Sequence, residues 1–109
     1  MSNQELFKAV RAGDIDLTRR ISREHPEIFN NNKSWIFDLS LRKSHDDICK
    51  WFITTNKSDI ELMTDCCLDI NSEFSNQMLK YIINFYDVIE LKIPNFDQVI
   101  KDTIAGLSN

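Results

Sequence analysis

The chain has 109 residues, of which 42% are hydrophobic and 28% are charged, and its formal net charge is −4 at pH 7. This length and composition predict one soluble globular domain and exclude a disordered chain. Only two glycines and two prolines occur, too few for the turns of an all-β fold, so we expect an all-α fold. The acidic balance argues against nucleic-acid binding, because phosphate affinity depends on clustered Lys and Arg.

The sequence shows no segment that directs the chain to a membrane. No apolar run is long enough to span a bilayer, and the N-terminus lacks the charged-then-apolar pattern of a signal peptide. Three cysteines, of which Cys66 and Cys67 are adjacent, form a poor disulfide framework. Reduced thiols in an intracellular protein are the simpler account. We therefore expect a cytoplasmic protein that makes no contact with a membrane.

Residues 4–25 predict two short helices joined by a tight turn. The apolar positions of the first helix share one face and are Leu6, Ala9 and Val10. Gly13 supplies the left-handed residue that ends this helix. Asp14 or Asp16 can cap the second helix, and Pro26 stops it.

The next segment predicts a second helical pair. A short extended apolar step at residues 28–29 leads to Ser34, which is placed to cap a helix over residues 35–43. After a turn at residues 44–47, a further helix carries an apolar stripe of Ile48, Trp51, Phe52 and Ile53. Residues 54–65 are expected to repeat the connecting loop.

A third pair is expected over residues 66–74 and 76–85, and a last helix over residues 96–105. The last helix has the pattern of half a unit and would serve as a cap. The domain then consists of units at roughly 4–34, 35–65 and 66–95, with a cap at 96–109.

One offset of 31 residues relates these units. It aligns the turn positions Gly13, Ser44 and Ser75, and it aligns several sets of apolar positions. The apolar sets are Leu6, Phe37 and Leu68; Leu17, Ile48 and Leu79; Ile21, Phe52 and Ile83; and Phe29, Ile60 and Leu91. Because a single helix pair cannot bury its own apolar face, such a period indicates stacked helical repeats.

The repeating residues resemble the ankyrin repeat family over essentially the whole chain. The first unit matches best, with Leu6, the pair Ala9 and Val10, and the turn at Gly13 and Asp14. No unit has the family's T-P-L-H start; the equivalent segments read QELF, WIFD and CCLD, so the bonds that usually tie one loop to the next are expected to be missing. The resemblance implies an ankyrin-like α-solenoid of about seven helices. The Asn- and Ile-rich style is similar to repeat proteins of large DNA viruses or intracellular bacteria, which would imply virus–host interaction.

In ankyrin-like stacking, the ends of the first helices face a concave groove that binds a partner protein. The resemblance then implies groove contacts at Arg11, Arg42, Lys43, Glu73 and Phe74. Secondary contacts are expected at two loop tips, at Asn31, Asn32, Ser34, Leu62, Met63 and Asp65. A solvated charged face that binds nothing is the alternative for the charged positions.

Catalytic and metal-binding patterns are weak. Asp46 and Asp47 have the position of helix-capping carboxylates rather than of an acid–base pair. His45 and Cys49 have the spacing of two metal ligands on a helix, and the cysteine pair Cys66 and Cys67 could complete a zinc site, although adjacent cysteines rarely bind one ion. Trp35, Trp51 and Phe52 are expected in the core, with an aromatic binding surface as the alternative. We expect no metal, cofactor or enzymatic activity.

The sequence thus favours a non-enzymatic adaptor or inhibitor that binds another protein through the groove and loop tips. The alternative is a self-associating repeat protein. In that case a homodimer would form through apolar residues of the C-terminal cap, at Phe96, Val99, Ile100 and Ile104.

Overall fold

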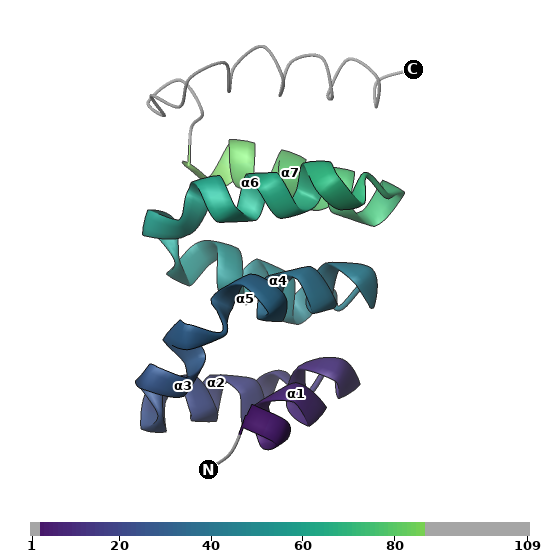
Figure 1. Cartoon of the computed structure of the whole chain (residues 1–109). Helices are drawn as coiled ribbons and strands as arrows, with labels where there is room; N and C mark the ends of the chain where they lie inside the picture. Colours follow the sequence, from purple (N-terminus) through teal and green to yellow (C-terminus); the bar gives the residue numbers. More distant parts are fainter. Residues whose placement is uncertain (1–2, 87–109) are drawn as a thin grey trace.

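The computed structural model describes residues 3–86, and this part of the chain is all-helical, as predicted (Figure 1). No strand occurs between residues 3 and 86. The elements in order are α1 (Asn3–Ala12), α2 (Ile15–Glu24), α3 (Pro26–Asn31), α4 (Lys33–Arg42), α5 (Asp46–Thr55), the short 3-10 helix η1 (Lys57–Asp59), α6 (Ile60–Ile70) and α7 (Glu73–Tyr86).

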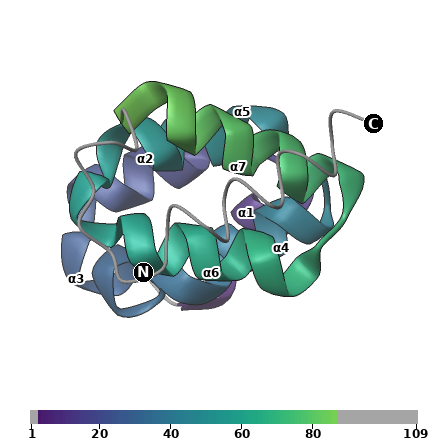
Figure 2. The same cartoon turned by 90° about the horizontal axis from the view of Figure 1, so that it is seen from above.

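Three helical hairpins stack on one another in chain order. They are formed by α1 with α2, α4 with α5, and α6 with α7. The first helix of each hairpin packs against the first helix of the next, and the second helices follow the same order on the other side (Figure 2). The connectors α3 and η1 lie at one end of the helices, and the tight turns within the hairpins lie at the other (Figure 1). We call the side formed by α1, α4 and α6 the first-helix face.

The core runs through the stack between the two rows of helices. Leu6 and Val10 of α1, Phe37 of α4, and Phe52 of α5 are fully buried. Phe52 lies 5.1 Å from Phe37 and 6.0 Å from Phe29, measured between ring centroids. Because these rings come from different hairpins and from the connector α3, they join neighbouring units into one core. Burying a large apolar side chain stabilises a fold by roughly 1.5–3 kcal/mol, so these contacts hold the stack together.

Each hairpin turn contains one residue with a left-handed backbone. These residues are Gly13, Ser44 and Asn71, with φ angles of 75°, 57° and 47°. Glycine adopts this conformation without steric cost, and Asn tolerates it better than most residues. In the first turn Asp14 then caps α2, since its side chain accepts a hydrogen bond of 3.1 Å from the backbone N–H of Leu17. The predicted turn at Gly13 and the predicted cap at Asp14 are therefore confirmed.

The third turn corrects the predicted period. The left-handed residue is Asn71 rather than Ser75, so the stride is 31 residues from the first turn to the second but 27 from the second to the third. Ser75 lies in the first turn of α7, is fully buried, and exchanges hydrogen bonds of 2.8 and 3.0 Å with Ser72. The connector before the third hairpin, residues 56–59, is four residues shorter than residues 25–32.

The apolar columns hid this shift because four residues are close to one helical turn of about 3.6 residues. Leu17, Ile48 and Leu79 do fall on the equivalent helices α2, α5 and α7. Leu17 and Ile48 are the third residues of their helices, whereas Leu79 is the seventh of α7. The fixed offset therefore names the right face of α7 at a position one turn too far along.

Three other boundaries differ from the prediction. Pro26 begins α3 rather than simply ending α2, since its fixed φ suits the first position of a helix; the expected extended step at residues 28–29 is thus helical. Ser34 lies inside α4, and Asn32 is the residue before that helix. Most of the expected loop at residues 54–65 is instead η1 and the start of α6. The expected cap at residues 96–109 lies outside the described residues.

The first two turns are also tied to each other. Nε2 of His45 donates a hydrogen bond of 2.9 Å to the backbone oxygen of Arg11, and the His45 ring lies directly over Gly13. A Cβ added to Gly13 would lie 2.8 Å from Nδ1 of His45. This link corrects the expectation that bonds between successive loops are missing, since a histidine in the turn of the second hairpin supplies one.

Gly13→Ala is expected to lower the free energy of unfolding by about 1–3 kcal/mol, because it places a side chain at positive φ and against the His45 ring. Urea unfolding followed by circular dichroism measures the change. In a His45→Ala background the same substitution should cost less, because the ring is gone. Ser44→Gly, at the equivalent turn, should be neutral or stabilising; an equal loss from both substitutions would contradict the role assigned to Gly13.

Candidate functional site

The first-helix face is hollowed between α1 and α4. The hollow has a volume of about 690 Å³ and is lined mainly by apolar side chains and amides. Its lining residues are Asn3, Gln4, Phe7, Lys8, Asn32, Trp35, Asp38 and Leu39. We call this feature the aromatic hollow, after Phe7 and Trp35, whose ring centroids lie 5.8 Å apart.

Phe7 is unusual among the large apolar side chains of the chain. It is 44% exposed, although it lies directly after the fully buried Leu6. Successive residues of a helix point about 100° apart, so Phe7 stands beside the buried face of α1 rather than on it. Its ring faces the half-buried Trp35 across the junction of the first two hairpins. An aromatic side chain left exposed in a hollow is typical of a contact surface.

A polar network holds the wall of the hollow in place. Nε1 of Trp35 donates a hydrogen bond of 2.6 Å to the side-chain oxygen of Asn32. The amide nitrogen of Asn32 donates in turn to the backbone oxygen of Ile28, at 2.7 Å, and to the side-chain oxygen of Asn3, at 3.3 Å. Asn32, predicted as a contact at a loop tip, therefore serves to orient Trp35.

A second hollow, of about 640 Å³, lies where the second and third hairpins meet near their turns. It brings together three of the predicted groove residues, Arg42, Glu73 and Phe74. The other lining residues are Leu41, Ser44, Ile70, Ser72 and Gln77. Arg42 is not free in this hollow, because its Nε donates a hydrogen bond of 2.7 Å to Asp38, and this bond raises the pKa of Arg42.

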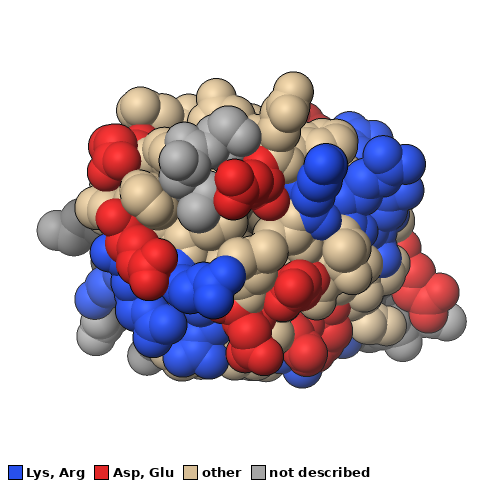
Figure 3. Space-filling view, turned by 90° about the horizontal axis from the view of Figure 1, so that it is seen from below, with Lys and Arg blue, Asp and Glu red and all other residues tan. Residues whose placement is uncertain are grey.

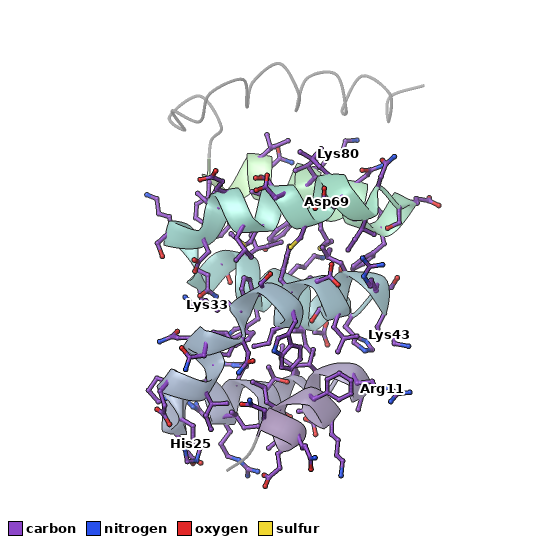
Figure 4. All side chains as sticks on the ribbon, in the orientation of Figure 1. Arg11, His25, Lys33, Lys43, Asp69 and Lys80 are labelled. Carbon is purple, nitrogen blue, oxygen red and sulfur yellow. The ribbon has the colours of Figure 1, made fainter. Side chains whose placement is uncertain are left out.

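Arg11 and Lys43, the remaining predicted groove residues, lie at the turn end of the stack (Figure 4). Both are exposed, and neither forms an ion pair with a residue between 3 and 86. Seen from below, Lys and Arg gather in two groups at opposite corners of the first hairpin, with uncharged surface between them (Figure 3). One cation group includes Arg20 and Arg23, which share a smaller hollow with Asp14 and Asp16.

The predicted loop-tip residues do not form one surface. Asn31 is exposed at the end of α3, Ser34 in the first turn of α4, and Asp65 in the middle of α6. Leu62 and Met63 lie in α6 rather than at a tip, and Met63 is fully buried. The prediction that Met63 contacts a partner is therefore wrong, because the helix that replaces the expected loop turns its side chain into the core.

The structure adds three residues that the sequence did not indicate as contacts. These are Phe7, Trp35 and Leu39, all in the aromatic hollow. Trp35 was expected in the core and is half-buried against it. Phe7 carried a usable signal, since it lies off the face formed by Leu6, Ala9 and Val10.

The cysteines are poor candidates for chemistry. Burial raises the pKa of Cys49 to about 12 and that of the half-buried Cys66 to about 11, and it also raises the pKa of Cys67. Nearby carboxylates add to these shifts, chiefly Asp46 for Cys49 and Asp38 for Cys66. Within residues 3–86, no three His, Cys, Asp or Glu side chains are arranged to hold a metal ion. In the same part of the chain, no helix is both long and apolar enough to cross a membrane.

Met63→Ala is expected to lower the free energy of unfolding by about 2–5 kcal/mol, because it opens a cavity in a closely packed core. Leu62→Ala, at the half-buried neighbouring position, should cost clearly less. Urea unfolding of both variants measures the difference. An equal or larger loss from Leu62→Ala would contradict the placement of α6.

The thiols are expected to react slowly with Ellman's reagent at pH 8 in the folded protein, because a raised pKa leaves little thiolate at that pH. The rate should rise with pH toward the pKa of Cys66, about 11, and all three thiols should react rapidly in urea. Cys66→Ser should remove the faster native phase. Loss of that phase in Cys49→Ser instead would contradict the burial described above.

Comparison with protein-family models, with curated proteins and with solved structures finds no match for this chain. The resemblance to ankyrin repeats therefore stays a prediction from the sequence, and the function has to be argued from the surface itself.

Proposed function

We propose that this chain is a non-enzymatic protein-binding module, an adaptor or inhibitor that docks a partner protein on its first-helix face. The observation that carries the proposal is the aromatic hollow, in which Phe7 remains 44% exposed beside Trp35. The ankyrin-like architecture, the cytoplasmic location and a role in virus–host contact belong to the same proposal.

The chemistry of the aromatic hollow favours binding over catalysis. Of its polar side chains, Asn32 is used to hold Trp35, and Asp38 is bonded to Arg42. A catalytic site usually brings together titratable groups whose pKa values are shifted toward the working pH. The cysteines show the opposite, since their pKa values move away from neutral pH. An aromatic wall with few available polar groups is instead suited to an apolar anchor from a partner.

Rigidity supports the same function. Trp35 is fixed by a chain of hydrogen bonds through Asn32 to two helices. Phe7 lies on α1, whose C-terminal end is bonded to His45 of the next hairpin. A surface that is already ordered loses little conformational entropy on binding, so a modest contact area can give useful affinity.

The test is a selection of peptides from a random phage-displayed library against the full chain, followed by titration of the selected peptides with variants. Phe7→Ala should weaken binding about fivefold or more, as expected for a central aromatic contact. Phe85→Ala is the matched control, because Phe85 is 49% exposed but lies on α7. Both variants should keep the helical circular dichroism spectrum.

Peptides that bind equally well to the Phe7→Ala variant, or that lose affinity only with Phe85→Ala, would overturn the assignment to the aromatic hollow. A library that yields no peptide whose binding depends on Phe7 would have the same consequence.

A further inference from the structure

We propose that the partner of the aromatic hollow is an acidic amphipathic peptide segment, which places an apolar side chain against Phe7 and Trp35 and carboxylates near Arg11 and Lys43. This inference rests on the proposed function and adds the chemistry of the partner. Two features of the described residues carry it: where the cations stand relative to the hollow, and the lack of acidic side chains available to neutralise them.

The cations extend the hollow along both of its helices. Arg11 follows Phe7 by four residues on α1, and Lys43 follows Leu39 by four residues at the end of α4. Residues four apart lie one turn from each other on the same side of a helix. Each cation thus lies one turn beyond a residue that lines the hollow, and both lie at the same end of the stack (Figure 4). Lys8 lines the hollow itself.

The backbone that carries these cations is fixed. The carbonyl of Arg11 accepts the hydrogen bond from His45, at 2.9 Å. The backbone N–H of Lys43 donates to the carbonyl of Leu39, at 2.9 Å, as the cap of α4. A partner therefore meets an apolar hollow and a cationic end in a constant geometry, which matches a segment with an apolar anchor and acidic residues one turn away.

The carboxylates around the hollow leave these cations unneutralised. Asp38 is bonded to Arg42, at 2.7 Å. Glu5 precedes Phe7 by two residues, so it points roughly 200° away around α1. Asp14 lies beyond the turn and shares a hollow with Arg20 and Arg23. None of Lys8, Arg11 and Lys43 forms an ion pair with any residue of the described range 3–86.

The local charge, rather than the charge of the whole chain, decides the preference. The chain carries a net charge of −4, which by itself would favour a basic partner. At physiological salt, however, exposed charges are screened beyond about 8 Å. A peptide in the hollow therefore responds mainly to the cations next to it, and these favour carboxylates. A nucleic acid would answer the same cations, but its charged backbone offers no apolar anchor for the hollow.

The experiment compares two synthetic helical peptides long enough for about four turns. They share apolar residues at positions i, i+3, i+4 and i+7 and differ only in having Glu or Lys on the flanking positions. Fluorescence anisotropy with the full chain should show the Glu peptide binding about tenfold or more tightly, with a gap that narrows as salt is added. A short oligodeoxythymidine tests nucleic acid.

Charge reversal locates the effect. Arg11→Glu combined with Lys43→Glu should reverse the preference to the Lys peptide, whereas Arg20→Glu with Arg23→Glu, on α2, should leave it unchanged. Phe7→Ala should weaken both peptides, since both use the same anchor.

Equal or tighter binding of the Lys peptide, with dependence on Phe7 retained, would overturn this inference and leave the proposed function standing. Binding of neither peptide, or tighter binding of the oligonucleotide, would also overturn it. Binding of the Glu peptide that does not depend on Phe7 would overturn both the inference and the proposed function.

Discussion

The structure depends on one constraint: a pair of short helices cannot cover its own apolar side, so each hairpin has to be covered by the next. Phe37 and Phe52 belong to the middle hairpin, and Phe52 packs against Phe29 of the connector that precedes it. The middle hairpin is covered on both sides and carries much of the core. The turns are subordinate to this packing, because they must bring each new helix back over the last one within two or three residues.

The sequence was sufficient for the helical hairpins but not for their exact spacing. Gly13 and Asp14 have specific roles in a turn, and both could be assigned before the structure was known. Ser75 was assigned to a turn only by its distance from Ser44, and the structure places it inside α7. The difference is physical: apolar columns repeat with every helical turn, so they fix the face of a helix but not the position along it. The residue that marks the third turn, Asn71, carries a weaker signal than glycine.

The candidate site was less predictable for a related reason. Residues 25–32 form a helix and a cap that place Phe29 in the core and Asn32 next to Trp35. The second connector, residues 56–59, is too short to do the same. The two junctions of the stack therefore have different surfaces, although the sequence pattern suggested equivalent ones. Exposure of Phe7 depends on a neighbour across the first junction, and no pattern within α1 alone contains that information.

The shortened third stride also bears on how such a chain could be recombined. Gly13, Ser44 and Asn71 mark equivalent points in three hairpins, whatever the number of residues between them. Exchanging or duplicating a hairpin between these points would keep every helix whole. Cutting at a fixed interval of 31 residues would instead add or remove one turn of helix in the third hairpin and place Ser75, which is now fully buried, at a join. The natural boundaries for module exchange are therefore set by backbone conformation rather than by residue count.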